Sequence, residues 1–287
     1  MMHRLSQYIR YLDDEKAVLL VGAGISVLAG CSGLAAVKKK LSEIDSIKAD
    51  LKSMKTDNIS NKELLAFIKS KCKTPEDQRK YEGNMRESIV PDPNIFVRDY
   101  MPFVKIIKKI YKFPPIITTN VDSCLESTKE FDMTKVFYRP DDMTLGNLEN
   151  GGIFHIHGYL EDSQNEVWDL YDYEKRYNQN FKDFLVEVFK SYSILYVGYA
   201  FGDQELLTQM ALAKINNSSA VRHFALLPDD DFPPHVDEGL YEHLYNIHVI
   251  KYGPRASFVR VFCEWIESNF GGPGVAGPGT AMFMPSV

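Results

Sequence analysis

The sequence of 287 residues is poor in cysteine, and the cysteines that it has are not paired in sequence. Its four cysteines are Cys31, Cys72, Cys124 and Cys263. They lie far apart, and no C-x-x-C motif occurs, which argues against both a disulfide framework and a structural zinc site. We therefore expect a reducing compartment and a protein that contains no zinc.

The sequence also lacks an excess of positive charge and an evident membrane-spanning segment. Lys and Arg number 33 against 39 Asp and Glu, so no basic field attracts nucleic acid or an anionic membrane in general. The uncharged run 191–202 is shorter than the about 20 residues that span a bilayer, and the uncharged run 17–37 is divided into a predicted strand, a glycine-containing loop and a helical segment. Charges also interrupt residues 1–14, unlike a signal peptide. We expect a cytoplasmic protein with no membrane partner.

Short apolar or β-branched runs alternate along the chain with segments of helical periodicity. The runs cover residues 17–21, 116–119, 136–138, 153–157, 194–197, 223–227 and 247–250. Strands that alternate with helices form a mainly parallel sheet with helices on both faces, so we predict an α/β fold. The content of 45% hydrophobic and 25% charged residues is that of a globular protein and excludes disordered and fibrous classes.

Two segments break this alternation. Residues from about 35 to 95 are rich in Lys, Asp and Ser and show helical spacing without a convincing strand, which predicts a helical module inserted into one domain of residues 1–270. Residues 271–287 carry no charge and are dominated by Gly and Pro, which predicts a disordered tail. The aromatic stretch 161–190 favours a helix packed on the sheet, with a lid over a pocket as the alternative.

A glycine-containing loop, Gly22-Ala23-Gly24-Ile25-Ser26, closes the first predicted strand and leads into a helical segment. Glycines let backbone N–H groups approach a pyrophosphate, and a helix N-terminus adds partial positive charge. The third glycine of G-x-G-x-x-G is missing, because position 27 is Val. The alternative is a tight turn that needs small residues for packing alone. If the loop binds phosphate, Gly24→Val should weaken ligand binding far more than folding.

Polar residues follow the later strands, at the carboxyl ends where open α/β sheets bind ligands. Asn120 and Asp122 follow one strand, although either residue alone is also a common helix cap. His155 and His157 end another strand, and alternation predicts that both lie on one face. Two histidines so close together suggest a metal site, but no third ligand occurs at a recognisable spacing. The alternative is that they are structural residues.

The order of these segments resembles the sirtuin superfamily. The resemblance rests on Gly22-Ala23-Gly24-Ile25-Ser26 followed by Ala29-Gly30, on Thr119-Asn120-Val121-Asp122, on His157-Gly158 and on Gly198 at the end of a late strand. It implies a Rossmann-like NAD-binding domain, with the glycine loop at the pyrophosphate and Ser26 beside the phosphates or the ribose. It also implies that Asp122 lies near the nicotinamide carboxamide, and that Gly198 and Tyr199 border the adenosine side.

The resemblance further implies the catalytic residues, which are Asn120, Asp122 and His157. An amide that both donates and accepts suits Asn120 for holding water near C1′ of the nicotinamide ribose. A histidine with an ordinary pKa of about 6.5 suits His157 as a base toward water or a ribose hydroxyl.

The sequence departs from the protein-deacylating sirtuins, which carry a zinc module with two C-x-x-C pairs. Cys31-Ser32-Gly33-Leu34 replaces their Ile-Pro-Asp-Phe-Arg segment. The inserted helices and Gly198-Tyr199-Ala200-Phe201-Gly202-Asp203 look instead like a divergent, zinc-free branch of NAD-consuming, often antiviral, proteins.

This resemblance implies an NAD glycohydrolase that acts on NAD as its substrate. The alternatives are an NAD-dependent protein deacylase, a non-catalytic scaffold that binds NAD or ADP-ribose, and a metal hydrolase that uses His155 and His157. Because an unregulated NAD hydrolase would harm its own cell, we expect a homo-oligomer that controls activity. Docking of the apolar residues 282–284 on a neighbouring protomer is the alternative to a disordered tail.

Overall fold

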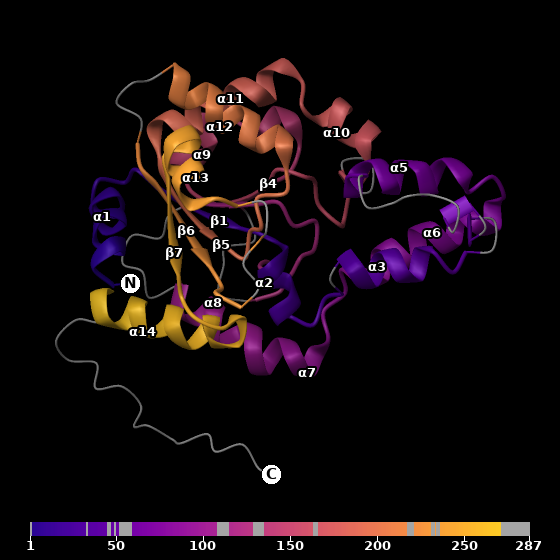
Figure 1. The fold of residues 1–287 in the computed structure, drawn as a ribbon, viewed down its shortest axis with the longest axis horizontal. Helices are drawn as coiled ribbons and strands as arrows, with labels where there is room; N and C mark the ends of the chain where they lie inside the picture. The colour runs from indigo at the N-terminus through magenta and orange to yellow at the C-terminus, as the bar shows by residue number, and fades with distance from the viewer. Residues whose placement is uncertain are drawn as a thin grey trace, which may run out of the picture.

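The computed structural model describes residues 2–32, 34–44, 47–48, 50–51, 59–107, 115–128, 135–162, 166–216, 221–230, 233 and 236–270. Their centre is a seven-stranded sheet of order β3-β4-β2-β1-β5-β6-β7 (Figure 1). The strands are β1 (Ala17–Val21), β2 (Ile116–Thr118), β3 (Val136–Phe137), β4 (Ile153–His155), β5 (Ser193–Val197), β6 (His223–Leu227) and β7 (Ile247–Lys251). Every pair of neighbouring strands is parallel, so the predicted α/β fold is confirmed and is Rossmann-like.

Strand β1 lies in the middle of the sheet and is buried along its whole length. Its apolar residues alternate between two cores: Leu19 and Val21 belong to one, and Val18 and Leu20 to the other. A strand covered on both faces must be apolar at every position, which explains the unbroken run in the sequence. In register, Leu20 lies opposite Ile117 of β2 on one side and Tyr196 of β5 on the other.

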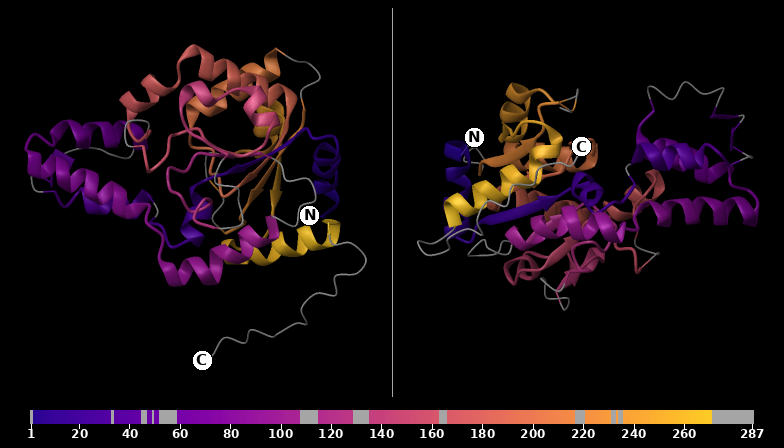
Figure 2. Two further views of the ribbon diagram at one scale, coloured as in Figure 1. Left: turned by 180° about the vertical axis from the view of Figure 1, so that it is seen from behind. Right: turned by 90° about the horizontal axis from the view of Figure 1, so that it is seen from below.

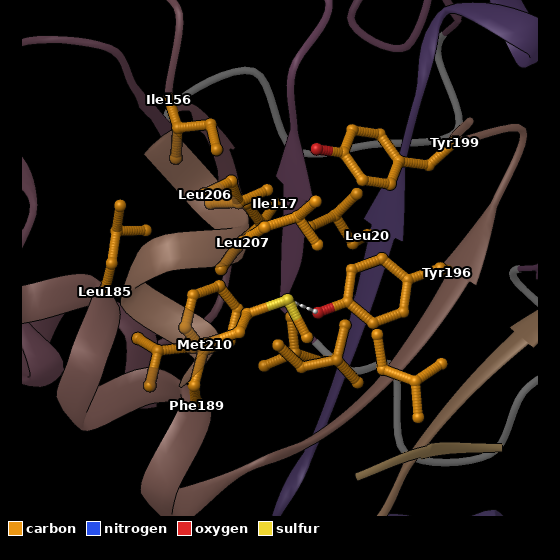
Figure 3. Close-up of a cluster of buried hydrophobic side chains, with 14 of the residues drawn as sticks. Leu20, Ile117, Ile156, Leu185, Phe189, Tyr196, Tyr199, Leu206, Leu207 and Met210 are labelled. Atoms are coloured by element: carbon orange, nitrogen blue, oxygen red, sulfur yellow. Dashed lines mark hydrogen bonds between the residues drawn. The ribbon is translucent and has the colours of Figure 1, made fainter. Parts of the chain in front are cut away.

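Helices cover both faces of the sheet (Figure 1). The first core is covered by α1 (Met2–Asp13), α8 (Met101–Ile107) and α14 (Phe258–Phe270), with the π-helix Phe96–Tyr100 and α7 (Pro93–Ile95) beside them. The second core is covered by α9 (Leu145–Glu149), α11 (Gln179–Ser191), α12 (Gln204–Ile215) and α13 (Glu238–Tyr245). Figure 3 shows this second core, where Tyr196 Oη donates to Met210 Sδ at 3.2 Å.

The region between α2 (Ala23–Leu28) and α7 projects from the sheet as a helical module (Figure 2). It contains α3 (Leu34–Leu41), α5 (Asn61–Lys71) and α6 (Pro75–Ser88), and its described residues include no strand. Its apolar residues form a separate small core that includes Leu41, Leu65 and Tyr81. The helical character expected for about 35–95 is therefore seen in the described part, and the exact domain limits stay a prediction.

The module is attached to the sheet domain through α5. Lys69 pairs with Asp169, the N-cap of α10 (Leu170–Arg176), at 2.6 Å, and Lys62 pairs with Glu205 of α12. Residues 271–287, and with them the proposed docking segment 282–284, lie outside the described residues. Among the described helices, none is both long and apolar enough to cross a bilayer.

Candidate functional site

The carboxyl ends of four adjacent strands, β4, β2, β1 and β5, carry the polar residues that the sequence singled out. The loop after β1 supplies Ser26, and the segment after β2 supplies Asn120 and Asp122. These three side chains are all buried, with at most 8% of their surface exposed. Neighbouring parallel strands end at the same edge, so residues about 95 positions apart in sequence meet there.

A short chain of hydrogen bonds joins the three side chains. Asn120 Nδ2 donates to Ser26 Oγ at 2.7 Å, and Ser26 Oγ donates to Asp122 Oδ2 at 2.6 Å. Asn120 Nδ2 also lies 3.1 Å from the carbonyl oxygen of Gly22. The other amide atom, Asn120 Oδ1, is buried and has no hydrogen-bond partner among the described residues. A buried acceptor without a partner is costly, so this atom marks a place for a donor such as water.

The segment after β2 is fixed to β1 by its threonines. Thr118 Oγ1 donates to the Val21 carbonyl at 2.9 Å and accepts from the backbone N–H of Asn120 at 3.0 Å. The backbone N–H of Thr119 also donates to the Val21 carbonyl, at 3.2 Å. These bonds hold the backbone that presents the Asn120 side chain toward the glycine loop.

The glycines of the loop allow close packing against the end of β5. A Cβ on Gly22 would lie 2.5 Å from the Gly198 carbonyl oxygen, and one on Gly24 would lie 2.9 Å from the same atom. Gly24 lies in α2 and is not among the described positions of positive φ, which include Gly198 at 62°. The expectation that Gly24→Val would affect ligand binding far more than folding is therefore wrong, because the side chain would strike the protein's own backbone.

The backbone amides of this loop are partly used by the fold. The N–H of Gly24 donates to the Gly198 carbonyl at 2.9 Å, and the N–H of Ile25 donates to the Gly22 carbonyl at 3.0 Å. Ala23 and Gly24 are nevertheless exposed, next to the buried Ser26. The packing alternative thus explains the two glycines, and a phosphate role for the exposed side of the loop stays a proposal.

The first of the two histidines, His155, has both ring nitrogens engaged. Its Nδ1 lies 2.8 Å from the Asn120 carbonyl oxygen, and its Nε2 lies 2.5 Å from Glu126 Oε1. Burial lowers the pKa of His155, but the charge and the hydrogen bond of Glu126 outweigh it, so that the pKa lies above the ordinary value. Because both nitrogens are engaged, we interpret His155 as a structural residue beside Asn120. A structural histidine was one of the two alternatives that the sequence left open.

The second histidine, His157, has different partners because β4 ends at His155, two residues earlier than the sequence suggested. The chain turns after β4, and the N–H of Gly158 donates to the His155 carbonyl at 3.1 Å. His157 Nε2 then lies 3.0 Å from Asp203 Oδ2 and 3.2 Å from the Tyr177 hydroxyl. The prediction that both histidines share one face is wrong, since the turn breaks the alternation of the strand.

This turn is held by an arginine to which no pattern in the sequence pointed. Arg176, the last residue of α10, donates from Nε to the Ile156 carbonyl and from Nη2 to the His155 carbonyl, both at 2.9 Å. Burial lowers the pKa of Arg176 to about 10. An arginine within an aromatic stretch gives no signal in the sequence that its guanidinium group reaches the end of a strand.

The part of the chain that carries these residues also matches a known family. Residues 114–250 match the model of the SIR2-like domain. This match supports a place for the chain in the sirtuin-like superfamily. The matched range includes Asn120, Asp122 and His157, whereas the glycine loop precedes it. Members of this family are NAD-dependent enzymes, which fits an NAD-related function. No curated protein matches the chain.

Two cysteines meet below the site of this sirtuin-like protein, which their sequence spacing did not indicate. Cys31 Sγ and Cys124 Sγ are 3.7 Å apart, and with an oxygen of Asp122 they form a group of possible ligand atoms within 4.8 Å of one another. The hydrogen bond with Cys31, burial and the charge of Asp122 all raise the pKa of Cys124. A structural zinc site normally has four ligands, and this group of described residues offers three.

Tyr199, expected to border the adenosine, belongs to the second core (Figure 3). Its ring lies 5.8 Å from the ring of Tyr196 and 4.9 Å from that of Phe201, and its hydroxyl has no partner among the described residues. The preceding Gly198 contacts the glycine loop. A role of Gly198 and Tyr199 in ligand binding stays a prediction. Because Tyr199 is buried, little of its surface is open to a ligand.

Proposed function

We propose that this sirtuin-like protein is an NAD glycohydrolase that converts NAD and water to nicotinamide and ADP-ribose. The observation that carries the proposal is the unpartnered, buried Oδ1 of Asn120. Because Asn120 Nδ2 is held by Ser26 and the Gly22 carbonyl, the orientation of the amide is fixed with Oδ1 as the free acceptor. An acceptor in that position suits a water molecule that donates a hydrogen bond to Oδ1 and turns a lone pair toward C1′.

The chemistry needs positioning and little covalent help from the protein. The C1′–N bond of NAD breaks, nicotinamide leaves as a neutral base, and the oxygen of water bonds to the oxocarbenium-like C1′. The water proton must pass to a base, and we assign that role to His157. Asp122 accepts from Ser26, and we assign to this carboxylate the orientation of the nicotinamide amide.

The finer features of the proposal follow from the same resemblance. We infer a zinc-free protein of the NAD-depleting, antiviral kind, acting in the cytoplasm and regulated by homo-oligomerisation. The exposed part of the loop at Ala23 and Gly24 would face the pyrophosphate. Elemental analysis for zinc and sedimentation at several protein concentrations test the metal and the oligomer separately from the activity.

Asn120→Ala tests the central assignment. We expect a loss of about 10²-fold or more in nicotinamide release from NAD, as for removal of a positioned catalytic group. Because Asn120 is buried, the free energy of unfolding of the variant must be measured as well. Asn147→Ala on α9 is the control, since it removes an amide that lies away from the site. Unchanged turnover in folded Asn120→Ala would refute the assignment. Turnover that requires an added acylated peptide would instead indicate the deacylase.

A further inference from the structure

The imidazole of His157 is held through only one of its nitrogens. Nε2 contacts Asp203 Oδ2 and the Tyr177 hydroxyl, whereas Nδ1 has no hydrogen-bond partner among the residues that the structure describes. A neutral imidazole carries its proton on one nitrogen, and the partner of that nitrogen decides which one. A carboxylate accepts and cannot donate, so it favours the tautomer with the proton on Nε2.

Asp203 is itself held rigidly, because it also begins a helix. It is the N-cap of α12, and its Oδ1 accepts from the backbone N–H groups of Glu205 at 3.1 Å and Leu206 at 3.2 Å. The other oxygen, Oδ2, is thereby turned toward His157. One carboxylate thus connects the start of α12 to the histidine after β4, and neither contact was visible in the sequence.

We propose that Asp203 is a positioning residue that keeps the proton of His157 on Nε2 and so leaves Nδ1 as the basic atom. The proposal rests on the proposed function, in which His157 accepts the proton of the attacking water. Asp203 does not touch the substrate in this scheme. It sets the tautomer and orientation of the ring and stabilises the imidazolium that forms when Nδ1 takes the proton.

The other groups that face His157 support the same arrangement. Tyr173 of α10 lies edge to face with the imidazole at 5.0 Å between ring centroids, and Tyr177, which follows α10 as its C-cap, lies at 6.2 Å. Burial, and to a lesser extent the charge of Asp203, raises the pKa of both phenols well above the ordinary value. Both hydroxyls therefore stay protonated and can donate hydrogen bonds. From the helical module, Lys62 lies over the Tyr173 ring at 5.1 Å and pairs with Glu205. Asp203 is therefore the acceptor at the centre of this group.

The test is Asp203→Asn, which keeps an oxygen for capping α12 and turns an NH₂ group toward His157. The amide would donate to Nε2 and move the histidine proton to Nδ1. We expect kcat for NAD hydrolysis to fall by about 10²-fold or more with little change in KM. Asp237→Asn is the matched control, since Asp237 caps α13 by accepting from Leu240 N–H at 2.7 Å in an exposed position. This control should keep full activity.

A second readout does not depend on activity. The ¹⁵N shifts of the imidazole nitrogens report the tautomer directly, and the His157 signals among the 7 histidines are assigned by their loss in His157→Gln. We expect the proton on Nε2 in the parent protein and on Nδ1 in Asp203→Asn. Tyr177→Phe should keep the tautomer and cost about 3- to 10-fold in kcat, since the contact of the hydroxyl with His157 and its long hydrogen bond to Asp203 Oδ2 are lost.

The two readouts separate the failure of this inference from failure of the proposed function. A parent protein that shows Nδ1–H, or an Asp203→Asn variant with unchanged tautomer or unchanged kcat, would overturn the role of Asp203. If the parent hydrolyses no NAD, the proposed function fails, and the base assignment fails with it even where the tautomer shift is seen.

Discussion

Two histidines lie two residues apart in this protein, and both are buried beside a carboxylate, but they differ in how many of their ring nitrogens have a partner. His155 is fully buried, and both its nitrogens are bonded, one to a carbonyl and one to the carboxylate of Glu126. His157 also meets a carboxylate, that of Asp203, but keeps one nitrogen without a described partner. The comparison teaches that a paired carboxylate does not by itself mark a catalytic histidine. What distinguishes His157 is its Nδ1, which has no hydrogen-bond partner among the described residues.

The largest effect is expected on stability, from His155→Ala. This change leaves Glu126 buried without its partner, and Glu126 Oε2 already lacks a described hydrogen bond. Breaking a buried ion pair by removing one member typically costs about 3–5 kcal/mol. Urea unfolding followed by circular dichroism measures this loss, while kcat per folded molecule should change by only a few-fold.

The opposite result would reverse the comparison. If His155→Ala kept the stability of the parent and lost NAD hydrolysis selectively, His155 would be the reactive histidine. Glu126→Gln provides a milder version of the same test, because it keeps the shape of the side chain and lets His155 stay neutral.

The next effect is expected on activity, from His157→Gln. Glutamine keeps a donor for Asp203 but has no basic nitrogen, so NAD hydrolysis should fall by about 10²-fold, or about 2.7 kcal/mol in transition-state stabilisation. The free energy of unfolding should change far less than in His155→Ala. His243→Gln on the exposed side of α13 is the matched control and should behave as the parent does. Equal activity of the two variants would remove His157 from the mechanism.

The sequence predicted the sheet well because the strands of a doubly covered sheet must be largely apolar, as β1 is throughout and β5 is after Ser193. It also placed Asn120 and Asp122 at the carboxyl end of a strand, which is the edge of the sheet where the structure brings them to Ser26 of the glycine loop. It did not predict Asp203 or Arg176 as partners of the β4 turn. These contacts depend on how helices α10 and α12 are placed on the sheet, which local periodicity does not encode.

The dependence of stability on pH gives an effect of intermediate size, in which two buried histidines oppose each other. The raised pKa of His155 means that its stabilisation is complete below the ordinary value of 6.5 and is lost as the pH rises through the folded-state pKa. Burial lowers the pKa of His223 to about 3, so stability falls as the pH drops below 6.5. That fall should reach about 2 kcal/mol at pH 5.

Unfolding free energies measured between pH 5 and pH 9 distinguish these two contributions. In His155→Gln the decline above pH 6.5 should disappear, while the decline toward pH 5 from His223 should remain. If the free energy of unfolding of this variant still declined above pH 6.5, His155 would not be the protonated member of a buried pair. The decline would then come from another group.

The smallest effect is expected from Ser26→Ala, at the point where the two regions meet. The Ser26 hydroxyl connects Asn120, whose carbonyl is held by His155, to Asp122. Its loss leaves Asn120 Nδ2 bonded to the Gly22 carbonyl and Asp122 Oδ1 bonded to the N–H of Cys124. Both side chains therefore stay partly satisfied, and we expect a loss of about 1 kcal/mol in stability and a decrease of about 5-fold in NAD hydrolysis. Ser127→Ala, which removes an exposed hydroxyl bonded to a backbone carbonyl in the same segment, is the control for both measurements. A loss of activity in Ser26→Ala as large as that in His157→Gln would mean that the hydroxyl contributes directly to catalysis. Its role would then go beyond connecting Asn120 to Asp122.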